Sequence, residues 1–265
     1  MLTRAQQERA QTLITDLSRS LQPSIDPGST GVFWLDDFPI GTLPTAQIAL
    51  LLTHPRLPGI FARRSPEQCP PASERDFTLA PGVTWTAAQV ALLAAFDRTA
   101  QHEALYLPHP TATIDRALCR LLGTPTTVVR LSVIADGQIL LATRSAHKRI
   151  NPGLFDNVAA GMVKSEETAT EALAREAWEE AGLRWEISEG PTTLTQRFHS
   201  YRPLTLGALS EETLLRRWSQ RVEPTINDGE VARFDWVTVD DFLDLAATDR
   251  MVPEAALATL LSLTA

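Results

Sequence analysis

The sequence predicts an α/β protein in which a small α+β domain, residues 1–122, precedes a larger domain, residues 123–265. Three observations support this prediction. The chain has 265 residues, a length that favours two domains over one. Helix and strand patterns alternate along the first half of the chain. From Thr126 onward, several strand patterns surround one helix that has clear start and stop signals.

The N-terminal domain is expected to begin with an amphipathic helix over about residues 2–21, because apolar residues recur there at roughly helical spacing. A strand-like GVFWLDD, a helical TAQIALLL and a strand-like GIFARR follow, and then a longer helix from Thr84 to about His102. The stretch SPEQCPPASERD is typical of an exposed loop. ATIDRALCRLLG predicts another helix, and the turn-forming Gly123, Thr124 and Pro125 mark the domain boundary.

The second domain is expected to open with a β-hairpin. TTVVRLSVIA and QILLATRS are strand-like, and Asp136-Gly137 between them tolerates the positive φ angles of a tight turn. TLTQRFHSY, ETLLRRWSQRV and EVARFDWVTV predict further strands, whereas DDFLDLAA and PEAALATLLSL predict helices. A helix over about residues 169–181 lies among the strands, because Thr168 with Glu171 forms a capping box and Gly182 supplies the stop.

Charge limits the classes of partner. The net charge of -8 disfavours a nucleic-acid backbone as partner, since such binders usually display basic surfaces. A small anionic substrate would need local help from a divalent cation and a few placed Lys or Arg residues, because the global field of an acidic protein repels phosphates.

The cysteines and the apolar runs indicate the cellular environment. Cys69 and Cys119 are far apart and lack a metal-ligand spacing, so neither a disulfide framework nor a zinc site is indicated. The charged N-terminus does not resemble a signal peptide, and no run approaches 18 apolar residues. We therefore expect a cytoplasmic protein that does not span a membrane, as a monomer or a homodimer.

Three glutamates carry the clearest chemical signal. Glu176, Glu179 and Glu180 stand at i, i+3 and i+4, so they share one face of the predicted helix and form a dense negative cluster. Such residues are also common on solvated helix surfaces. A divalent metal with oxygen ligands would relieve their mutual repulsion, which makes the cluster a candidate metal site.

The surrounding segment decides between these two interpretations. GMVKSEETATEALAREAWEEAGL fits a complete pattern: Gly, five residues, Glu, seven residues, Arg-Glu, apolar, any, Glu-Glu, any, Gly, apolar. At ordinary residue frequencies a chance match is on the order of one in a million. This segment resembles the Nudix signature, and the chain is identified from it as a Nudix hydrolase.

The resemblance implies a Nudix α/β/α sandwich with a mixed sheet, in which this loop and helix form the metal and diphosphate site. It implies Mg²⁺ as the cofactor, with Mn²⁺ as the alternative ion. Matched position by position, the metal ligands would be Glu176, Glu179 and Glu180, and the last two with Arg175 are the candidate catalytic residues. The counterparts of Arg175 and Glu167 form an ion pair that holds the loop on the helix. Gly161 and Glu167 therefore have auxiliary roles.

A narrower resemblance extends upstream. RSAHKRINPGLFDNVAAG is similar to a motif of the Nudix branch that has an extra N-terminal domain and is linked to thiamin diphosphate metabolism. The candidate substrate-binding residues are Arg144, Lys148 and Asn157. Arg144 and Lys148 would contact phosphate, or would simply face solvent at a strand end. Glu230, in a downstream DGEV, would complete the metal site or act as base, or would be a solvated turn residue.

The expected function is Mg²⁺-dependent hydrolysis of a diphosphate to a monophosphate and phosphate. The resemblance implies thiamin diphosphate derivatives as substrates, in particular oxo- and oxy-thiamin diphosphate, and hence a role in metabolite repair. Hydrolysis of ADP-ribose, dinucleotides or nucleoside phosphates is the alternative. A ligand-sensing module without catalysis is the non-enzymatic alternative, although such proteins usually have degenerate signatures. Isomerisation of a prenyl diphosphate normally uses an active-site cysteine, and neither cysteine lies in the signature or in the strand before it.

Overall fold

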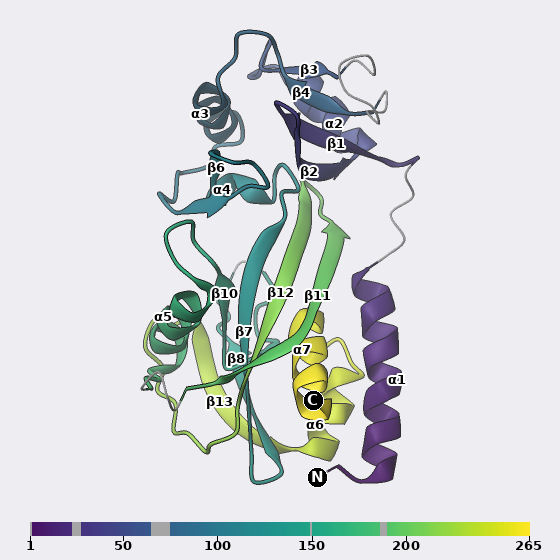
Figure 1. Cartoon of the computed structure of the whole chain (residues 1–265), viewed down its shortest axis with the longest axis vertical. Coiled ribbons are helices and arrows are strands. Elements are labelled where there is room, and N and C mark those ends of the chain that lie inside the picture. Colours follow the sequence, from purple (N-terminus) through teal and green to yellow (C-terminus); the bar gives the residue numbers. More distant parts are fainter. Residues whose placement is uncertain (1, 23–27, 65–74, 149, 186–189) are drawn as a thin grey trace.

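The computed structural model describes residues 2–22, 28–64, 75–148, 150–185 and 190–265, and its elements form two sheets and a short hairpin. The first part of the chain contains a four-stranded sheet in the order β2-β1-β4-β3 (Figure 1). Its elements are β1 (Thr30–Leu35), β2 (Phe38–Pro44), α2 (Thr45–Thr53), β3 (Phe61–Arg63), β4 (Phe77–Leu79) and α3 (Trp85–Ala95). A two-stranded hairpin of β5 (Ala104–Tyr106) and β6 (Thr113–Asp115) leads into the short α4 (Arg116–Cys119).

Most of the expected elements of this first part are present, and two differ. The helix expected from Thr84 to His102 ends at Ala95, because Asp97 and His102 take positive φ angles of 49° and 55° that helical backbone does not allow. ATIDRALCRLLG is only partly helical, since its first residues pair with β5 as strand β6. Most of the loop SPEQCPPASERD lies outside the described residues, as does Cys69.

The second part forms a mixed seven-stranded sheet with a path in the order β11-β12-β7-β8-β13. Only the β7 and β12 pair is parallel, and the hairpin of β7 and β8 is formed as predicted. The elements are β7 (Thr126–Ala135), β8 (Gln138–Arg144), β9 (Phe155–Asp156), β10 (Ala159–Met162), α5 (Ala169–Ala181), β11 (Thr192–Pro203), β12 (Ala208–Trp218), β13 (Val231–Thr238), α6 (Val239–Ala246) and α7 (Pro253–Thr264).

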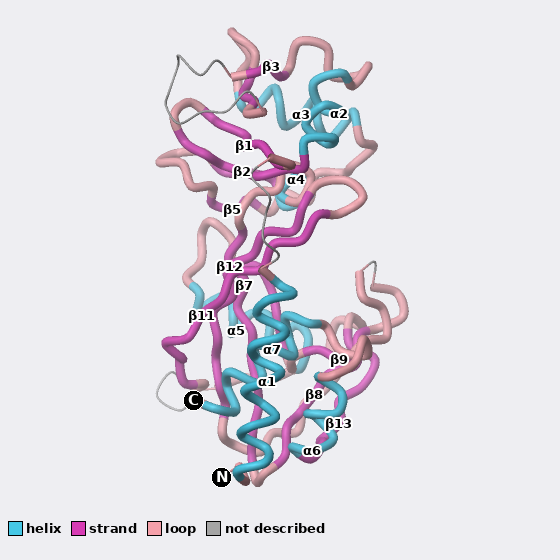
Figure 2. The backbone as a smooth tube through the Cα atoms, turned by 90° about the vertical axis from the view of Figure 1, so that its right-hand side faces the viewer, coloured by secondary structure: helices cyan, strands magenta, loops and turns pink. Residues whose placement is uncertain are grey.

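Helices cover both faces of this sheet, which confirms the predicted α/β/α sandwich. Leu173 and Ala177 of α5 pack on one face against Val129 and Leu131. On the other face, α6 and α7 pack against residues such as Ile139 and Leu141 (Figures 1 and 2). Among the described residues, no helix is long and apolar enough to cross a membrane.

The helix α1 (Arg4–Leu21) packs on the second part of the chain, although the sequence places it within the N-terminal domain. The helix lies beside α7 (Figure 2), its apolar face joins the core formed by α6 and α7, and Ala10 is fully buried there. An amphipathic helix binds wherever a matching apolar face lies, and sequence order does not determine that place. The boundary at residue 122 otherwise stays a prediction.

The two parts share a continuous core. Met162 and Ala208 belong to the same cluster of buried residues as Phe33 and Leu43 of the first sheet. The backbone of β2 lies directly on the turn after α4, because a Cβ atom added at Gly41 would overlap the carbonyl oxygen of Leu122. This close packing places α4 beside the second sheet and brings its side chains to the site described below.

The strand β7 changes its partner along its length. Residues 128–131 pair with β10, whereas residues 133–135 pair with β8. The sheet therefore divides between β8 and β10, and the loop that follows β8 lies at the division. This arrangement brings residues from that loop close to α5.

Candidate active site

Helix α5 is fixed at both ends by the residues that the sequence indicated. The Thr168 side chain accepts from the backbone N–H of Glu171, and the Glu171 side chain accepts from the backbone N–H of Thr168. Gly182 ends the helix at a φ of 64°. The predicted capping box and stop are confirmed, and they set the register in which the glutamates face β10.

Arg175 fastens the loop before α5 to the helix. Its Nε and Nη2 atoms lie 3.0 and 2.6 Å from the two carboxylate oxygens of Glu167, and Nη2 also donates to the carbonyl oxygen of Met162 at 3.2 Å. The backbone N–H of Lys164 donates to the same carboxylate at 2.9 Å. Burial opposes ionisation, yet these hydrogen bonds hold the pKa of Glu167 below its ordinary value. The structure thus contains the expected ion pair in the expected place.

Glu176 and Glu180 are buried against the backbone of β10. Glu180 accepts from the backbone N–H of Ala160 at 3.0 Å, and a Cβ atom at Gly161 would overlap the Glu176 carboxylate. Position 161 therefore requires glycine because of this close approach. Burial raises the pKa of Glu176, and it raises the pKa of Glu180 to about 8. A nearby positive charge favours the ionised form of both groups.

The three glutamates are less convergent than the sequence predicts. Glu179 is half-exposed and lies 3.2 Å from Arg175 Nη1, which also lies 2.6 Å from Glu176. Within the described ranges, no three acidic, His or Cys side chains form a preassembled metal site. The repulsion between the carboxylates is relieved by Arg175 in this arrangement. Carboxylate oxygens with raised pKa values remain a donor set suited to a hard divalent cation.

The loop after β8 brings Lys148 close to Glu230, which directly precedes β13. Lys148 Nζ forms an ion pair with Glu230 and lies 3.8 Å from Glu180 Oε1. Burial lowers the pKa of Lys148, although Glu180 opposes this shift. The side chain of Glu230 is half-exposed. The sequence indicated Glu230 as a residue that would complete the metal site, but it did not indicate that Lys148 lies near Glu180, because 32 positions separate these two residues.

Arg144 and Asn157 have structural partners. The Arg144 guanidinium lies 2.7 Å from Asp156 Oδ2 and donates to the backbone carbonyl of Ile150 at 2.9 Å. Asn157 is buried, and its side-chain amide donates to Thr259 Oγ1 at 2.9 Å. The expectation of a substrate contact for Asn157 does not fit this position, since the amide faces α7. Arg144 lines a cavity, so its role as a phosphate contact stays a prediction.

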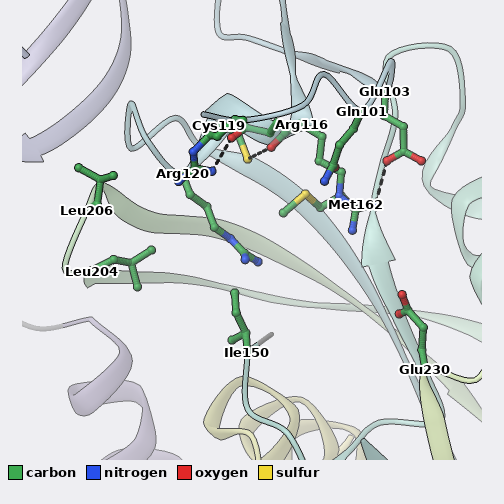
Figure 3. Close-up of a pocket in the computed structure, with 12 residues that line it drawn as sticks. Gln101, Glu103, Arg116, Cys119, Arg120, Ile150, Met162, Leu204, Leu206 and Glu230 are labelled. Carbon is green, nitrogen blue, oxygen red and sulfur yellow. Dashed lines mark hydrogen bonds and ion pairs between the residues drawn. The ribbon is translucent and has the colours of Figure 1, made fainter. Parts of the chain in front are cut away.

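A cavity of about 650 Å³ lies between α4 and the second sheet (Figure 3). The side chains of Arg116 and Arg120 project into it from α4, and Ile150 and Glu230 lie on the opposite side. Cys119 also lines it, but its thiol donates to the Arg116 carbonyl oxygen and burial raises its pKa. A second cavity of about 360 Å³ shares Arg116, Arg120, Ile150 and Glu230 with the first.

The second cavity also contains four arginines, Arg116, Arg120, Arg130 and Arg202, that no motif in the sequence indicated. Arg116 and Arg120 stand four residues apart in DRALCRLLG, so the helical spacing could have indicated that they share a face. Arg130 and Arg202 lie in different strands and carry no such local signal. Only the folded sheet brings the four residues to one cavity.

Comparison with known proteins agrees with this fold. The family model of the NUDIX domain matches residues 125–257, and the chain therefore belongs to the NUDIX domain family and is a Nudix-type hydrolase. An isopentenyl-diphosphate Delta-isomerase of Salmonella paratyphi B is 26% identical over 133 residues, which cover 48% of this chain and 70% of that protein.

Solved structures with a similar fold have lower sequence identity. The protein DR0079 from Deinococcus radiodurans is 23% identical with a TM-score of 0.46, covering 60% of this chain and 98% of that chain. A bifunctional NMN adenylyltransferase/ADP ribose pyrophosphatase from Francisella tularensis, complexed with AMP and a Mn ion, is 18% identical with a TM-score of 0.39. That match covers 53% of this chain and 41% of that chain.

Proposed function

We propose that this protein hydrolyses a small-molecule diphosphate to a monophosphate and phosphate with the help of Mg²⁺, and that Mn²⁺ is the alternative ion. The observation that carries the proposal is the pair of buried carboxylates, Glu176 and Glu180, on a helix that Arg175 and Glu167 fasten to the preceding loop. Buried acids with raised pKa values are costly unless they bind a cation, and a diphosphate needs a cation to neutralise its charge.

The residues of the chain have distinct roles in this proposal. Glu176, Glu179 and Glu180 would hold the metal, which when bound supplies charge neutralisation and lowers the pKa of a water molecule. Arg175 positions the ligand glutamates through its contacts with Glu176 and Glu179. Lys148, which lies 3.8 Å from Glu180, supplies a positive charge for a phosphate oxygen. Glu230 is the candidate proton acceptor because it is half-exposed and contacts Lys148.

The substrates that we favour are thiamin diphosphate derivatives, in particular the oxo- and oxy-forms, which would make this a metabolite-repair enzyme. The resemblance of the segment from Arg144 to Asn157 to the thiamin-linked branch suggests them. Residues of both parts of the chain line the cavity, and its volume of about 650 Å³ supports a substrate larger than inorganic diphosphate. Ala117, Leu204 and Leu206 supply apolar lining, and Gln101 and Arg116 supply polar groups.

Isomerisation of a prenyl diphosphate, the activity in the name of the Salmonella relatives, is the second candidate because of the sequence similarity. The strand before α5 has alanines at positions 159 and 160, and it contains no cysteine. The buried thiol of Cys119 is already hydrogen-bonded to backbone. These features favour hydrolysis, and isopentenyl diphosphate should therefore be included in the substrate panel.

The products should be measured at one Mg²⁺ concentration, with and without chelator: the monophosphate and phosphate from oxo-thiamin diphosphate, the two organic monophosphates from ADP-ribose, and the isomerised diphosphate or the monophosphate and phosphate from isopentenyl diphosphate. We expect oxo-thiamin diphosphate to be the fastest substrate and chelator to abolish its turnover. Equal or faster turnover of ADP-ribose would exclude the thiamin assignment.

A variant pair tests the metal site itself. Glu180→Gln should lose at least about tenfold in kcat, because one ligand charge is removed from the transition state. Glu171→Gln is the matched control, since Glu171 is an exposed glutamate of the same helix and glutamine preserves the capping box. Full turnover by Glu180→Gln would contradict the proposed metal chemistry.

A further inference from the structure

Three arginines from distant parts of the chain line the cavity of about 360 Å³. Arg120 follows α4, Arg130 lies on β7 and Arg202 lies on β11. The side chain of Arg130 is only 8% exposed, so more than nine-tenths of it is buried. The side chains of Arg120 and Arg202 are 33% and 43% exposed, and three guanidiniums in one cavity repel one another unless an anion lies between them.

These guanidiniums have few acceptors within the protein. Among the described residues, the side chains of Arg120 and Arg202 donate no hydrogen bond, and the Nε atoms of all three arginines are buried without a partner. The nearest carboxylate to Arg120 is Glu211 at 3.8 Å, and the nearest to Arg202 is Glu254 at 3.9 Å. Both separations exceed hydrogen-bonding distance. A purely structural network would use these donors, because buried unsatisfied groups are unfavourable.

The side chains that line the cavity carry an excess of positive charge, which a bound anion would balance. Its lining contains six Arg or Lys side chains and four carboxylates, in a protein whose net charge is -8. Glu211, whose pKa is raised by burial, lies 3.8 Å from Arg120. Arg130 keeps only its contacts with Asp156 and Asn157, at 3.1 and 3.4 Å.

The cavity reaches the proposed catalytic region. Lys148 lines it together with the arginines, and its Nζ atom lies 3.8 Å from Glu180 Oε1. A diphosphate beside Glu180 and Lys148 would therefore extend toward the guanidiniums. Their planar forks match the oxygens of a phosphate group.

We propose that Arg120, Arg130 and Arg202 form a binding site for the free terminal phosphate of the substrate. This inference rests on the proposed function and specifies which class of diphosphate the enzyme would bind. The enzyme would prefer diphosphates with an unesterified terminal phosphate over substrates such as ADP-ribose, in which both phosphates carry an organic group. Inorganic phosphate would bind the same site as the product.

Inorganic phosphate is the first probe, and its binding to the full chain can be measured by calorimetry without turnover. Arg120→Gln and Arg202→Gln should each weaken phosphate binding by about tenfold, because each removes a charge-assisted contact. Arg197→Gln is the matched control, since Arg197 is an exposed arginine on β11, the strand that carries Arg202, and it pairs with Glu212. Melting temperatures of all variants would show that each one folds. Unchanged phosphate affinity in folded Arg120→Gln and Arg202→Gln would overturn the site.

Substrate discrimination is the second measurement. The ratio of kcat/KM for thiamin diphosphate to kcat/KM for ADP-ribose should fall by about tenfold in Arg120→Gln and stay constant in Arg197→Gln. The ratio for Arg120→Lys should lie between the ratios for wild type and Arg120→Gln, because lysine keeps the positive charge but lacks the planar guanidinium group. Weaker phosphate binding with an unchanged ratio would show a site for free phosphate only, which overturns the terminal-phosphate assignment. If no diphosphate is hydrolysed, the proposed function fails, whereas the phosphate measurement still tests the site.

Discussion

Buried glutamates occur in two places near the site, on α5 and beside the cavity arginines. Glu176 and Glu180 contact the backbone of β10, whereas Glu211 lies on β12, 3.8 Å from Arg120. Burial raises the pKa of each of these three carboxyl groups. The first two are expected to bind a metal, and Glu211 lies among arginines. Similar residues thus serve different purposes because their neighbours differ.

Glu211 should make the stability of the protein depend on pH. Its folded-state pKa is raised above the ordinary value of about 4.5, so the group is protonated in both states below that pH. As the pH rises above 4.5, the unfolded chain releases this proton more readily than the folded chain, and the free energy of unfolding falls until the folded pKa is passed. Glutamine does not titrate. Glu211→Gln should therefore gain stability relative to wild type as the pH rises above about 4.5.

Urea denaturation across this pH range measures the difference. Glu212→Gln is the control, because the adjacent Glu212 is partly exposed and pairs with Arg197 on the surface. A difference in unfolding free energy between Glu211→Gln and wild type that stays constant with pH would contradict the prediction.

At the scale of secondary-structure elements, side-chain contacts hold the loop before α5 in a defined position on the helix. Thr168 and Gly182 define the ends of the helix, and Arg175 connects it to Glu167 and to the end of β10. The capping interactions determine where the helix starts. The Arg175 contacts determine where its glutamates lie relative to the sheet.

Arg175→Lys should lower kcat/KM by about tenfold, because lysine cannot hold the Glu167 carboxylate and the Met162 carbonyl simultaneously. Thr168→Ala is the companion variant. It should cost about 1 kcal/mol of stability through loss of the cap while changing kcat/KM little. Steady-state kinetics and chemical denaturation of both variants test the separation. Full activity of Arg175→Lys would show that this contact does not position the site.

For the molecule as a whole, packing between distant segments completes the fold. The turn after α4 lies on β2, and α1 lies along α6 and α7 (Figure 1). The first contact positions the arginines that face the second sheet. The second contact covers the apolar face that α6 and α7 would otherwise expose.

Ala10→Glu tests the packing of α1. Ala10 is fully buried, so a carboxylate there would have to be buried without a partner or force the helix away from α6 and α7. We expect a loss of about 3–5 kcal/mol in unfolding free energy, as for other uncompensated buried charges. Gln11→Glu adds the same charge at an exposed neighbouring position and should change stability by less than about 0.5 kcal/mol. Equal stability of the two variants would show that α1 does not need this contact.

The sequence alone determined the features that local patterns encode. The hairpin at Asp136-Gly137, the capped helix α5 and the signature glutamates all follow from residues within one segment of the chain. The ion pair of Arg175 and Glu167 belongs to this group, because only eight positions separate the two residues. Short-range spacing is sufficient where the interacting residues share a helix or its adjoining loop.

Only the tertiary structure decided which distant residues meet. The short strands β9 and β10 depend on pairing with β8 and β7, so their own sequences carry little signal. Asn157 turns toward α7, and α1 packs beyond the boundary that its sequence position suggested. The cavity arginines come together from α4, β7 and β11 for the same reason. Such contacts depend on sheet order and packing of apolar faces, which no local spacing specifies.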